Sequence, residues 1–303
     1  MQSEATDNQN HSAGILMMSV GILFLCLNDA LAKTLTERYA PIQIIFIRNL
    51  ISTPVALLIA YKMGGASALR SRRIGIHIIR AVVWVTATVL FFSSLMFLEL
   101  AEATALIFVA PLFITAIAAL FFGEEVGWAR WTAVVVGFLG VLIIVRPSGA
   151  TFQLASLLPI ATALFYAILM LSARWVDRGD SVWTLMLYST GLSAVICAAI
   201  TPFFWTALRL EDLWLFAAIA LCGTLGITMM TQAFRMAPAV VIAPLEYSSL
   251  LWATLIGWLV WAEIPDAATY LGAAVIIGSG LLILYRERAA RRAVRGAVRP
   301  SKS

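Results

Sequence analysis

The chain alternates between long apolar runs and short polar segments. Ten runs are apolar over about 17 to 25 residues, the length a helix needs to cross a hydrocarbon core of about 30 Å. They cover residues 13–33, 42–62, 74–97, 102–122, 130–146, 153–173, 183–205, 212–234, 239–261 and 267–285. Because the runs are continuous rather than alternating in polarity, they predict helices and exclude a barrel. We therefore expect an all-α membrane protein with ten transmembrane helices.

The composition agrees with a membrane protein and excludes several other classes. Of the 303 residues, 62% are hydrophobic and only 12% are charged. Soluble domains are about half apolar and about a quarter charged, so a soluble enzyme of this composition could not cover its surface. The net charge of +5 does not indicate nucleic acid, because seven basic residues lie in the last eighteen positions, after the final apolar run. The expected partner is the lipid bilayer.

The distribution of basic residues predicts the orientation in the membrane. If both termini face the cytoplasm, fifteen Lys and Arg residues lie in cytoplasmic segments and four on the other side. Cytoplasmic loops carry the excess of basic residues, so we expect a multi-pass protein of the bacterial inner (plasma) membrane with cytoplasmic N- and C-termini. Residues 1–12 lack the basic residues of a signal peptide and are predicted as a cytoplasmic leader. Residues 287–303 are predicted as a basic cytoplasmic tail.

Similar segments recur in the two halves of the chain. Ala110-Pro111-Leu112 is matched by Ala243-Pro244-Leu245, and Phe121-Phe122-Gly123-Glu124 is matched by Trp261-Ala262-Glu263. Both matches need small gaps. Apolar helices that end in Gly and Glu can also resemble one another by chance, so this alternative stays open.

The placement of these matches divides the ten helices into two sets of five, residues 13–146 and 153–286. Because five is odd, the two halves would enter the membrane in opposite senses. Inverted five-helix repeats are typical of secondary transporters, in which the substrate site lies at the interface between the halves.

Several segments also resemble a known family. The stretches Glu246–Asp266 and Leu271–Glu287 are similar to the second-repeat signature of EamA-type members of the drug/metabolite transporter superfamily, and Asp29–Lys33 and Ile45–Asn49 match the same pattern. The resemblance implies ten helices, cytoplasmic termini, and export or exchange of small metabolites. The group includes YddG-type amino-acid exporters and relatives that move nucleotide-like or vitamin-like solutes.

The two halves depart from each other in one respect. Pro111 lies well along the fourth predicted helix, whereas Pro244 lies early in the ninth and Tyr247 falls near the equivalent depth. The two halves of a transport cavity therefore need not be chemically symmetric.

Ionisable groups at membrane depth are costly and are therefore candidates for function. Asp29 and Lys33 lie four residues apart on one face of the first helix, next to Asn28, and Arg48 enters the second helix at similar depth. A guanidinium binds carboxylates through two parallel hydrogen bonds, so Arg48 is a candidate for a substrate carboxylate. A closed cluster of Asp29, Lys33 and Arg48 that only ties two helices together is the alternative.

A second charged pair is expected nearer the cytoplasmic side. Arg80 in the third helix and Glu246 in the ninth lie at about the same depth, roughly 9–11 Å from the helix ends at 1.5 Å per residue. They are predicted to pair across the repeat interface, where a zwitterionic ligand would compete for both groups. Protonation of Glu246 that couples transport to the proton gradient, or a static ion pair, are the alternatives.

Aromatic residues accompany these charges. Trp84 lies one turn past Arg80, Tyr166 is central in the sixth helix, and Tyr247 follows Glu246. Such rings suit an aromatic substrate or face an ammonium, although many membrane aromatics only pack. The motifs Ala133-x-x-x-Gly137 and Ala274-x-x-x-Gly278 permit close approach of helices, within one protomer or in a possible homodimer.

These observations favour a transporter over an enzyme. The sequence has two histidines and no phosphate-binding loop, metal-binding HExxH or nucleophile GxSxG motif, so no catalytic residue, metal or cofactor is expected. The prediction is an inner-membrane exporter of small metabolites, most of all amino acids, including aromatic and hydrophobic ones, working by alternating access. Uptake or exchange of a nucleotide-like or vitamin-like solute such as S-adenosylmethionine is the alternative.

Overall fold

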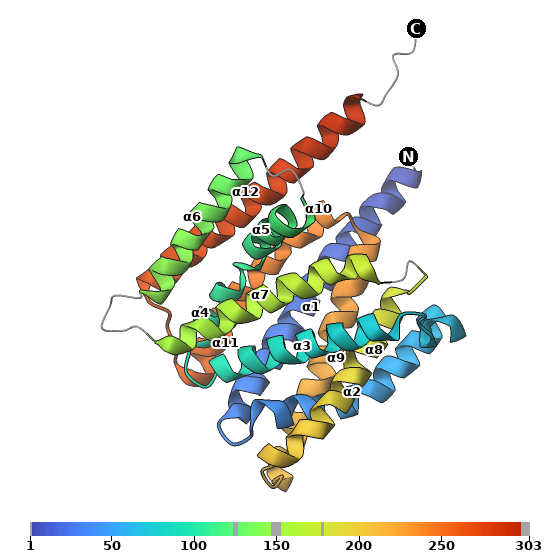
Figure 1. Cartoon of the computed structure of the whole chain (residues 1–303), viewed down its shortest axis with the longest axis vertical. Helices are drawn as coiled ribbons and strands as arrows, with labels where there is room; N and C mark the ends of the chain where they lie inside the picture. Colours follow the sequence, from blue (N-terminus) through green and yellow to red (C-terminus); the bar gives the residue numbers. More distant parts are fainter. Residues whose placement is uncertain (1, 124–126, 147–152, 177–178, 298–303) are drawn as a thin grey trace.

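The computed structural model describes residues 2–123, 127–146, 153–176 and 179–297, which are helical and contain no strand. The helices are α1 (Gln2–Thr36), α2 (Pro41–Gly64), α3 (Ile74–Ser94), α4 (Leu100–Ile107), α5 (Ala110–Phe122), α6 (Trp128–Val145), α7 (Leu157–Ser172), α8 (Val182–Ile200), α9 (Leu213–Met236), α10 (Ala239–Ile242), α11 (Ser249–Trp261) and α12 (Ala267–Ala297). Short 3-10 turns join several of them (Figure 1).

Seven helical segments of the described chain are long and apolar enough to cross a membrane. They are Ser12–Thr36, Pro41–Gly64, Ile74–Ser94, Leu100–Phe122, Leu154–Trp175, Val182–Phe204 and Leu210–Met236. Two shorter apolar helices span Arg130–Val145 and Ala267–Ile283. An all-α membrane protein is therefore confirmed, and the count of ten spans stays a prediction.

Two helices extend beyond the predicted spans. α1 begins at Gln2 and α12 continues to Ala297, so most of the predicted leader 1–12 and part of the tail 287–303 continue the adjoining helices. Extending an existing helix adds one hydrogen bond for each residue that is fixed, which favours continuation over a new irregular segment. Figure 1 shows both termini at the same end of the bundle, which we name the terminal end; the opposite end is the far end.

The predicted helices 102–122 and 239–261 are each interrupted. α4 ends at Ile107 and α5 begins at Ala110, while α10 is followed by a 3-10 helix at Ala243–Ser248, named η6, before α11 begins. Pro111 and Pro244 each occupy one of the first two positions of the segment after the break. Proline lacks an N–H and clashes with the preceding turn, so it begins a helical segment more easily than it continues one.

The helices pack in pairs that combine the first half of the chain with the second. α1 packs against α9, α3 against α7, α2 against α8, α4 against α11, and α6 against α12 (Figure 1). Exchanging each of the five segments of one half with its counterpart in the other converts the α1–α9 contact into the α7–α3 contact. The α2–α8 and α6–α12 pairs convert into themselves.

Glycines allow the closest of these contacts. A Cβ atom on Gly272 would lie 2.6 Å from the backbone oxygen of Gly140, so α6 and α12 approach too closely there for a side chain. Gly137 faces Ser279 of α12 inside the same protomer, which agrees with packing as the role of its motif. Gly278 has no other atom within 4 Å of its Cβ position, and the possible homodimer stays a prediction.

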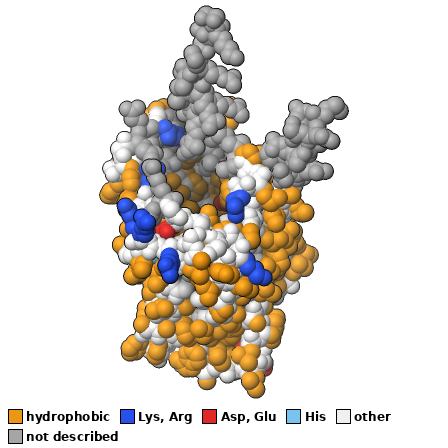
Figure 2. All heavy atoms as spheres, turned by 90° about the vertical axis from the view of Figure 1, so that its right-hand side faces the viewer, with side chains coloured by type: hydrophobic (Ala, Val, Ile, Leu, Met, Phe, Trp, Pro, Cys, Tyr) orange, Lys and Arg blue, Asp and Glu red, His pale blue; other side chains and the backbone are white. Residues whose placement is uncertain are grey.

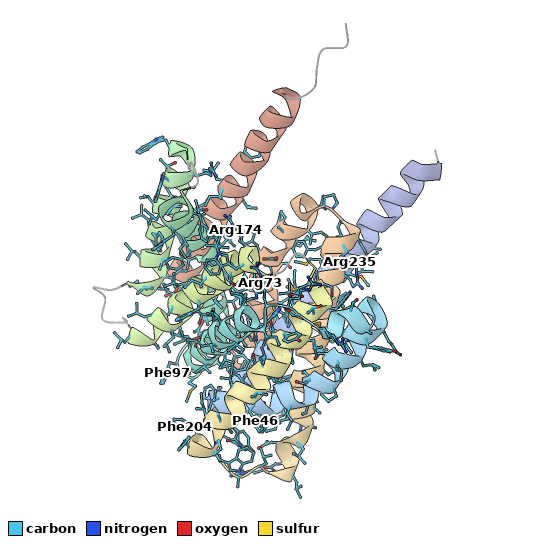
Figure 3. The ribbon with its side chains drawn as sticks, turned by 45° about the vertical axis from the view of Figure 1, so that its right-hand side comes forward. Phe46, Arg73, Phe97, Arg174, Phe204 and Arg235 are labelled. Carbon is cyan, nitrogen blue, oxygen red and sulfur yellow. The ribbon has the colours of Figure 1, made fainter. Side chains whose placement is uncertain are left out.

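One face of the molecule is largely apolar over its far half (Figure 2). Figure 2 shows hydrophobic side chains covering the far half of the visible face, with Lys and Arg side chains gathered toward the terminal end. Figure 3 likewise has Arg73, Arg174 and Arg235 nearer the termini than Phe97 and Phe204. Apolar patches of this extent indicate contact with lipid rather than water.

Candidate functional site

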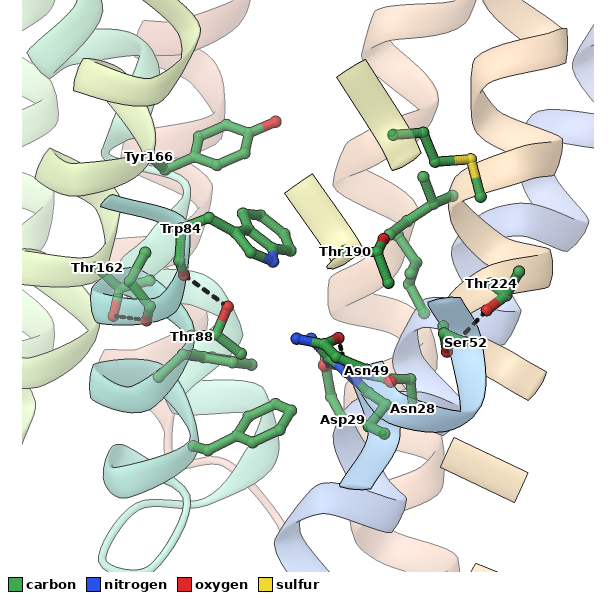
Figure 4. Close-up of a pocket in the computed structure, with 18 of the residues that line it drawn as sticks. Asn28, Asp29, Asn49, Ser52, Trp84, Thr88, Thr162, Tyr166, Thr190 and Thr224 are labelled. Carbon is green, nitrogen blue, oxygen red and sulfur yellow. Dashed lines mark hydrogen bonds between the residues drawn. The ribbon is translucent and has the colours of Figure 1, made fainter. Parts of the chain in front are cut away.

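A cavity of about 290 Å³ lies between the two halves of the bundle. Residues of α1, α2, α3, α7, α8 and α9, together with Ile107 at the end of α4, line it. Its polar lining residues are Asn28, Asp29, Arg48, Asn49, Ser52, Thr88, Thr162, Thr190 and Thr224 (Figure 4). Polar side chains are expensive inside a membrane protein unless they face a cavity or one another, so these polar residues mark the cavity as the candidate substrate site.

Asn28, Asp29, Arg48 and Asn49 form a charged cluster on the α1–α2 side of the cavity, which we name the polar floor. Asn28 Nδ2 donates to Asp29 Oδ1 at 3.0 Å, and Arg48 Nε donates to Asn49 Oδ1 at 3.4 Å. Asp29 and Arg48 attract each other electrostatically, yet no ion pair within contact distance joins Arg48 to any described carboxylate. The guanidinium therefore retains donors for a ligand anion.

The amide groups of the polar floor also have unused hydrogen-bonding capacity. Asn28 Oδ1 and Asn49 Nδ2 are both buried without a hydrogen-bond partner in the described chain. A buried polar atom left unpaired costs free energy, about 1–3 kcal/mol. The polar floor is thus incomplete, with a donor and an acceptor unsatisfied beside one guanidinium and one carboxylate.

Aromatic rings face the polar floor from α3 and α7. Trp84 and Tyr166 lie across the cavity from Asn28 and Asn49 (Figure 4). Phe92 continues this wall, with the Arg48 guanidinium carbon 5.6 Å from its ring centre. The cavity therefore combines a polar floor with an aromatic wall.

Lys33 does not join the polar floor, so the alternative of a closed cluster of Asp29, Lys33 and Arg48 is not formed. Lys33 forms an ion pair with Glu263 and donates to the backbone oxygen of Leu98 at 2.8 Å. One turn closer to the end of α1 than Asp29, it reaches the loops at the far end, where these acceptors lie. This leaves Asp29 and Arg48 as the charged residues that line the cavity.

The predicted pair of Arg80 and Glu246 is also not formed. Arg80 is buried, and its Nη1 donates to Leu169 O at 2.7 Å and to Ser172 Oγ at 2.6 Å, near the C-terminus of α7. The last carbonyl groups of a helix lack partners within the helix and attract cations, which accounts for this position. Arg80 therefore ties α3 to α7 and does not line the cavity.

Glu246 and Tyr247 lie in η6, outside the cavity lining. The Glu246 carboxylate is close enough to Tyr166 and Tyr247 to interact with both electrostatically. The Tyr247 ring packs edge-on against Phe108 with 5.1 Å between ring centres. The two interrupted segments thus meet near the α7 side of the cavity.

Of the nine residues predicted for the site, the structure brings five to the cavity and leaves four outside. Asn28, Asp29, Arg48, Trp84 and Tyr166 line it, whereas Lys33, Arg80, Glu246 and Tyr247 do not. Sequence reasoning missed Asn49 and the small hydroxyl residues Ser52, Thr88, Thr162, Thr190 and Thr224. Asn49 carried a usable signal, a second polar residue beside Arg48 inside an apolar helix. Single Ser and Thr residues carry none, because they also bond to the preceding turn of their own helix.

The chain belongs to the EamA-like transporter family, which matches residues 12–146 and again residues 153–285. It is therefore a membrane transporter rather than an enzyme, as the sequence analysis expects.

Individual relatives transport different solutes. The S-adenosylmethionine uptake transporter of Rickettsia bellii is 27% identical, over 93% of this chain and 97% of the relative. The riboflavin transporter of Vibrio cholerae is 29% identical, over 89% and 92%. The pseudopaline exporter CntI of Pseudomonas aeruginosa is 25% identical, over 88% and 93%.

A protein of known crystal structure has the same fold, with a TM-score of 0.59 and 21% sequence identity. The match covers 92% of this chain and 99% of the other.

Proposed function

We propose that this protein is a secondary transporter for small metabolites that carry an α-amino-acid headgroup, and that export of amino acids is its primary activity. The observation that carries the proposal is the Arg48 guanidinium on the polar floor, which lies near Asp29 and forms no ion pair with a carboxylate of the described residues.

The polar floor matches a zwitterion in charge and in hydrogen bonding. Arg48 offers donors for a carboxylate, and the unsatisfied Nδ2 of Asn49 adds another nearby. Asp29 and the unsatisfied Oδ1 of Asn28 offer acceptors for an ammonium group. Because the floor carries one charge of each sign, a zwitterion leaves its net charge unchanged, which limits the cost of carrying charge through a membrane.

The aromatic wall determines which side chain the substrate can carry. Trp84, Tyr166 and Phe92 provide apolar and π surface opposite the headgroup site, which suits an aromatic or hydrophobic side chain. A volume of about 290 Å³ is close to the lower limit of about 300 Å³ for small-molecule pockets. The proposed substrates are therefore compact.

A second candidate is uptake or exchange of an S-adenosylmethionine-like solute. The Rickettsia relative named for this solute supports it, and the solute carries the same α-amino-acid headgroup, which places its cationic and aromatic remainder opposite Trp84 and Tyr166. Both candidates thus use the same polar floor and differ in what the aromatic wall accepts.

The architecture proposed with this function is ten spans in two inverted repeats, 13–146 and 153–286, with both termini in the cytoplasm of a bacterial cell. Two consecutive family matches, the exchange symmetry of the helix pairs and the corresponding breaks before Pro111 and Pro244 support the repeats. The basic side chains at the terminal end support the orientation. A site between inverted repeats is then exposed to one side of the membrane at a time.

Counterflow into proteoliposomes tests the substrate. The labelled solutes are phenylalanine, leucine, lysine, glutamate and S-adenosylmethionine. We expect saturable exchange of the amino acids. Exchange of S-adenosylmethionine alone favours the second candidate, and exchange of none of the five contradicts the headgroup proposal.

Two arginine variants make the assay specific for the polar floor. Arg48→Lys keeps the charge and loses the paired donors, so the KM rises about tenfold or more, since one charge-assisted hydrogen bond contributes about 1.5–3 kcal/mol. Arg38→Lys is the matched control, because Arg38 forms an exposed ion pair with Glu211 outside the cavity. An unchanged KM in Arg48→Lys contradicts the assignment.

A further inference from the structure

At the far end of the bundle, one buried ion pair joins the two halves of the chain. Lys33 at the end of α1 pairs with Glu263, which follows α11, and both side chains are mostly buried, with 11% and 19% exposed. Lys33 Nζ also donates to Leu98 O at 2.8 Å and lies 5.2 Å from the centre of the Trp261 ring. Glu263 Oε2 accepts from the N–H of Leu100 at 3.1 Å.

These contacts surround an apolar layer between the cavity and the far surface. Leu35, Leu95, Leu98 and Leu100 are all at most 2% exposed and belong to one core cluster. Asp29 of the polar floor lies one helical turn before Lys33 on α1. A solute that leaves the cavity toward the far end must therefore separate this layer and the ion pair.

The backbone before Glu263 is strained in a way that fits a functional role. Ala262 has a φ of 55°, in the left-handed region that favours glycine, and the corresponding residue of the first half, Gly123, has a φ of 64°. The N–H of Glu263 then bonds to Gly257 O at 3.1 Å, which ends α11 and directs Glu263 toward Lys33. Strain of this kind persists where the surrounding structure holds it and is frequent at functional sites.

A related contact lies at the terminal end. The guanidinium carbon of Arg174, just after α7, lies 4.9 Å from the centre of the Phe122 ring at the end of α5. In the five-helix repeats, Arg174 and Phe122 occupy the positions that correspond to Lys33 and Trp261. Each end of the bundle therefore has a cation over an aromatic ring, between segments of different repeats.

We propose that Lys33 and Glu263 are the latch of the far-end gate: their ion pair holds the far end shut and breaks when the cavity opens toward that side. The ion pair crosses between the repeats, which must move apart for access. It also lies one turn from Asp29, so a ligand that displaces Asp29 acts on the latch through α1. Lys33 and Glu263 are positioning residues of the transport cycle and do not touch the substrate.

Thiol labelling from each side of the membrane tests the latch without any substrate. A reporter cysteine replaces Thr88, which lines the cavity, in a chain whose Cys26, Cys197 and Cys222 are changed to Ala and whose melting temperature in detergent matches that of the parent. A membrane-impermeant cationic methanethiosulfonate is added from the far side or from the terminal side. In Lys33→Ala we expect labelling from the far side to accelerate about tenfold, because loss of the pair shifts the population toward the open state. Labelling from the terminal side should not accelerate.

Arg38→Ala is the matched control, since Arg38 also forms ion pairs at the far end, with Glu211 at 3.1 Å and Asp212 at 3.3 Å, but its side chain is 48% exposed. It should label at the parental rate. Equal acceleration from both sides in Lys33→Ala, or no acceleration from the far side, overturns the latch.

A charge exchange keeps the proposal testable if Lys33→Ala does not fold. The single variants Lys33→Glu and Glu263→Lys should label quickly from the far side, because each places two like charges together. The double variant Lys33→Glu with Glu263→Lys should return labelling toward the parental rate. If the double variant labels as fast as the single ones, the ion pair does not control the gate. Because no transported solute enters this assay, a wrong substrate assignment leaves its result unchanged.

Discussion

Gly223 of α9 offers a steric test of the polar floor. A Cβ atom added to Gly223 would lie 2.9 Å from Asn28 Oδ1 and 4.0 Å from Arg48 Cδ. In Gly223→Ala, Asn28 must therefore rotate away, which breaks its hydrogen bond to Asp29, 3.0 Å long in the parent. A hydrogen bond to a charged group contributes about 1.5–3 kcal/mol.

A loss of about 1.5–3 kcal/mol corresponds to a rise of roughly 10- to 150-fold in the KM for a substrate whose ammonium binds Asp29. Counterflow kinetics in proteoliposomes measure this change. Gly278→Ala is the matched control, because its added methyl group meets no atom within 4 Å. An unchanged KM in Gly223→Ala, or an equal rise in Gly278→Ala, refutes the role of Asn28 and Asp29 as a paired acceptor site.

Two further predictions concern residues outside the cavity. Arg80→Gln should lower the melting temperature in detergent and leave the KM of the folded protein unchanged, because Arg80 bonds to Leu169 and Ser172 rather than to the cavity; a raised KM at parental stability would reverse this assignment. Asp266 lies before α12, where the Thr269 backbone N–H and then Arg146 lower the pKa of its carboxyl group. Because the pKa is lower in the folded state, the ionised carboxylate stabilises the fold at pH values above the unfolded-state pKa of about 3.9. This contribution is lost as the pH falls through the folded-state pKa. Asp266→Asn should thus lower the melting temperature at pH 7, and this loss should shrink as the pH falls below about 3.9; a loss of equal size at every pH would show that the charge is irrelevant.

The fold follows from the sequence because each apolar run is long enough to identify on its own. The breaks within 102–122 and 239–261 were harder to predict, since Pro111 and Pro244 within long helices can also produce only a kink. Pro111 separates α4 from α5, and Pro244 lies in the segment between α10 and α11. These breaks depend on neighbouring helices that pack against both pieces, α7 against α4 and α5, and α1 against α10 and α11.

The site was predictable where a residue is costly in lipid. Asp29 and Arg48 are such residues, each bonds to the amide side chain beside it, and both line the cavity. Lys33 and Arg80 are as costly, but their partners, Glu263 for Lys33 and the end of α7 for Arg80, come from distant segments that no local pattern reveals. Burial depth along a helix therefore identified the candidates and could not assign their partners.

The central claim is that the polar floor binds both charges of an α-amino-acid headgroup, and competition in counterflow tests it most directly. The labelled solute is the one exchanged fastest by the unmodified protein, and the competitors are its unlabelled form, its carboxyl methyl ester and its N-acetyl derivative. We predict that each derivative competes at least about tenfold more weakly than the parent, because each loses one charge-assisted contact with Arg48 or Asp29. Either derivative competing as well as the parent solute would contradict the claim.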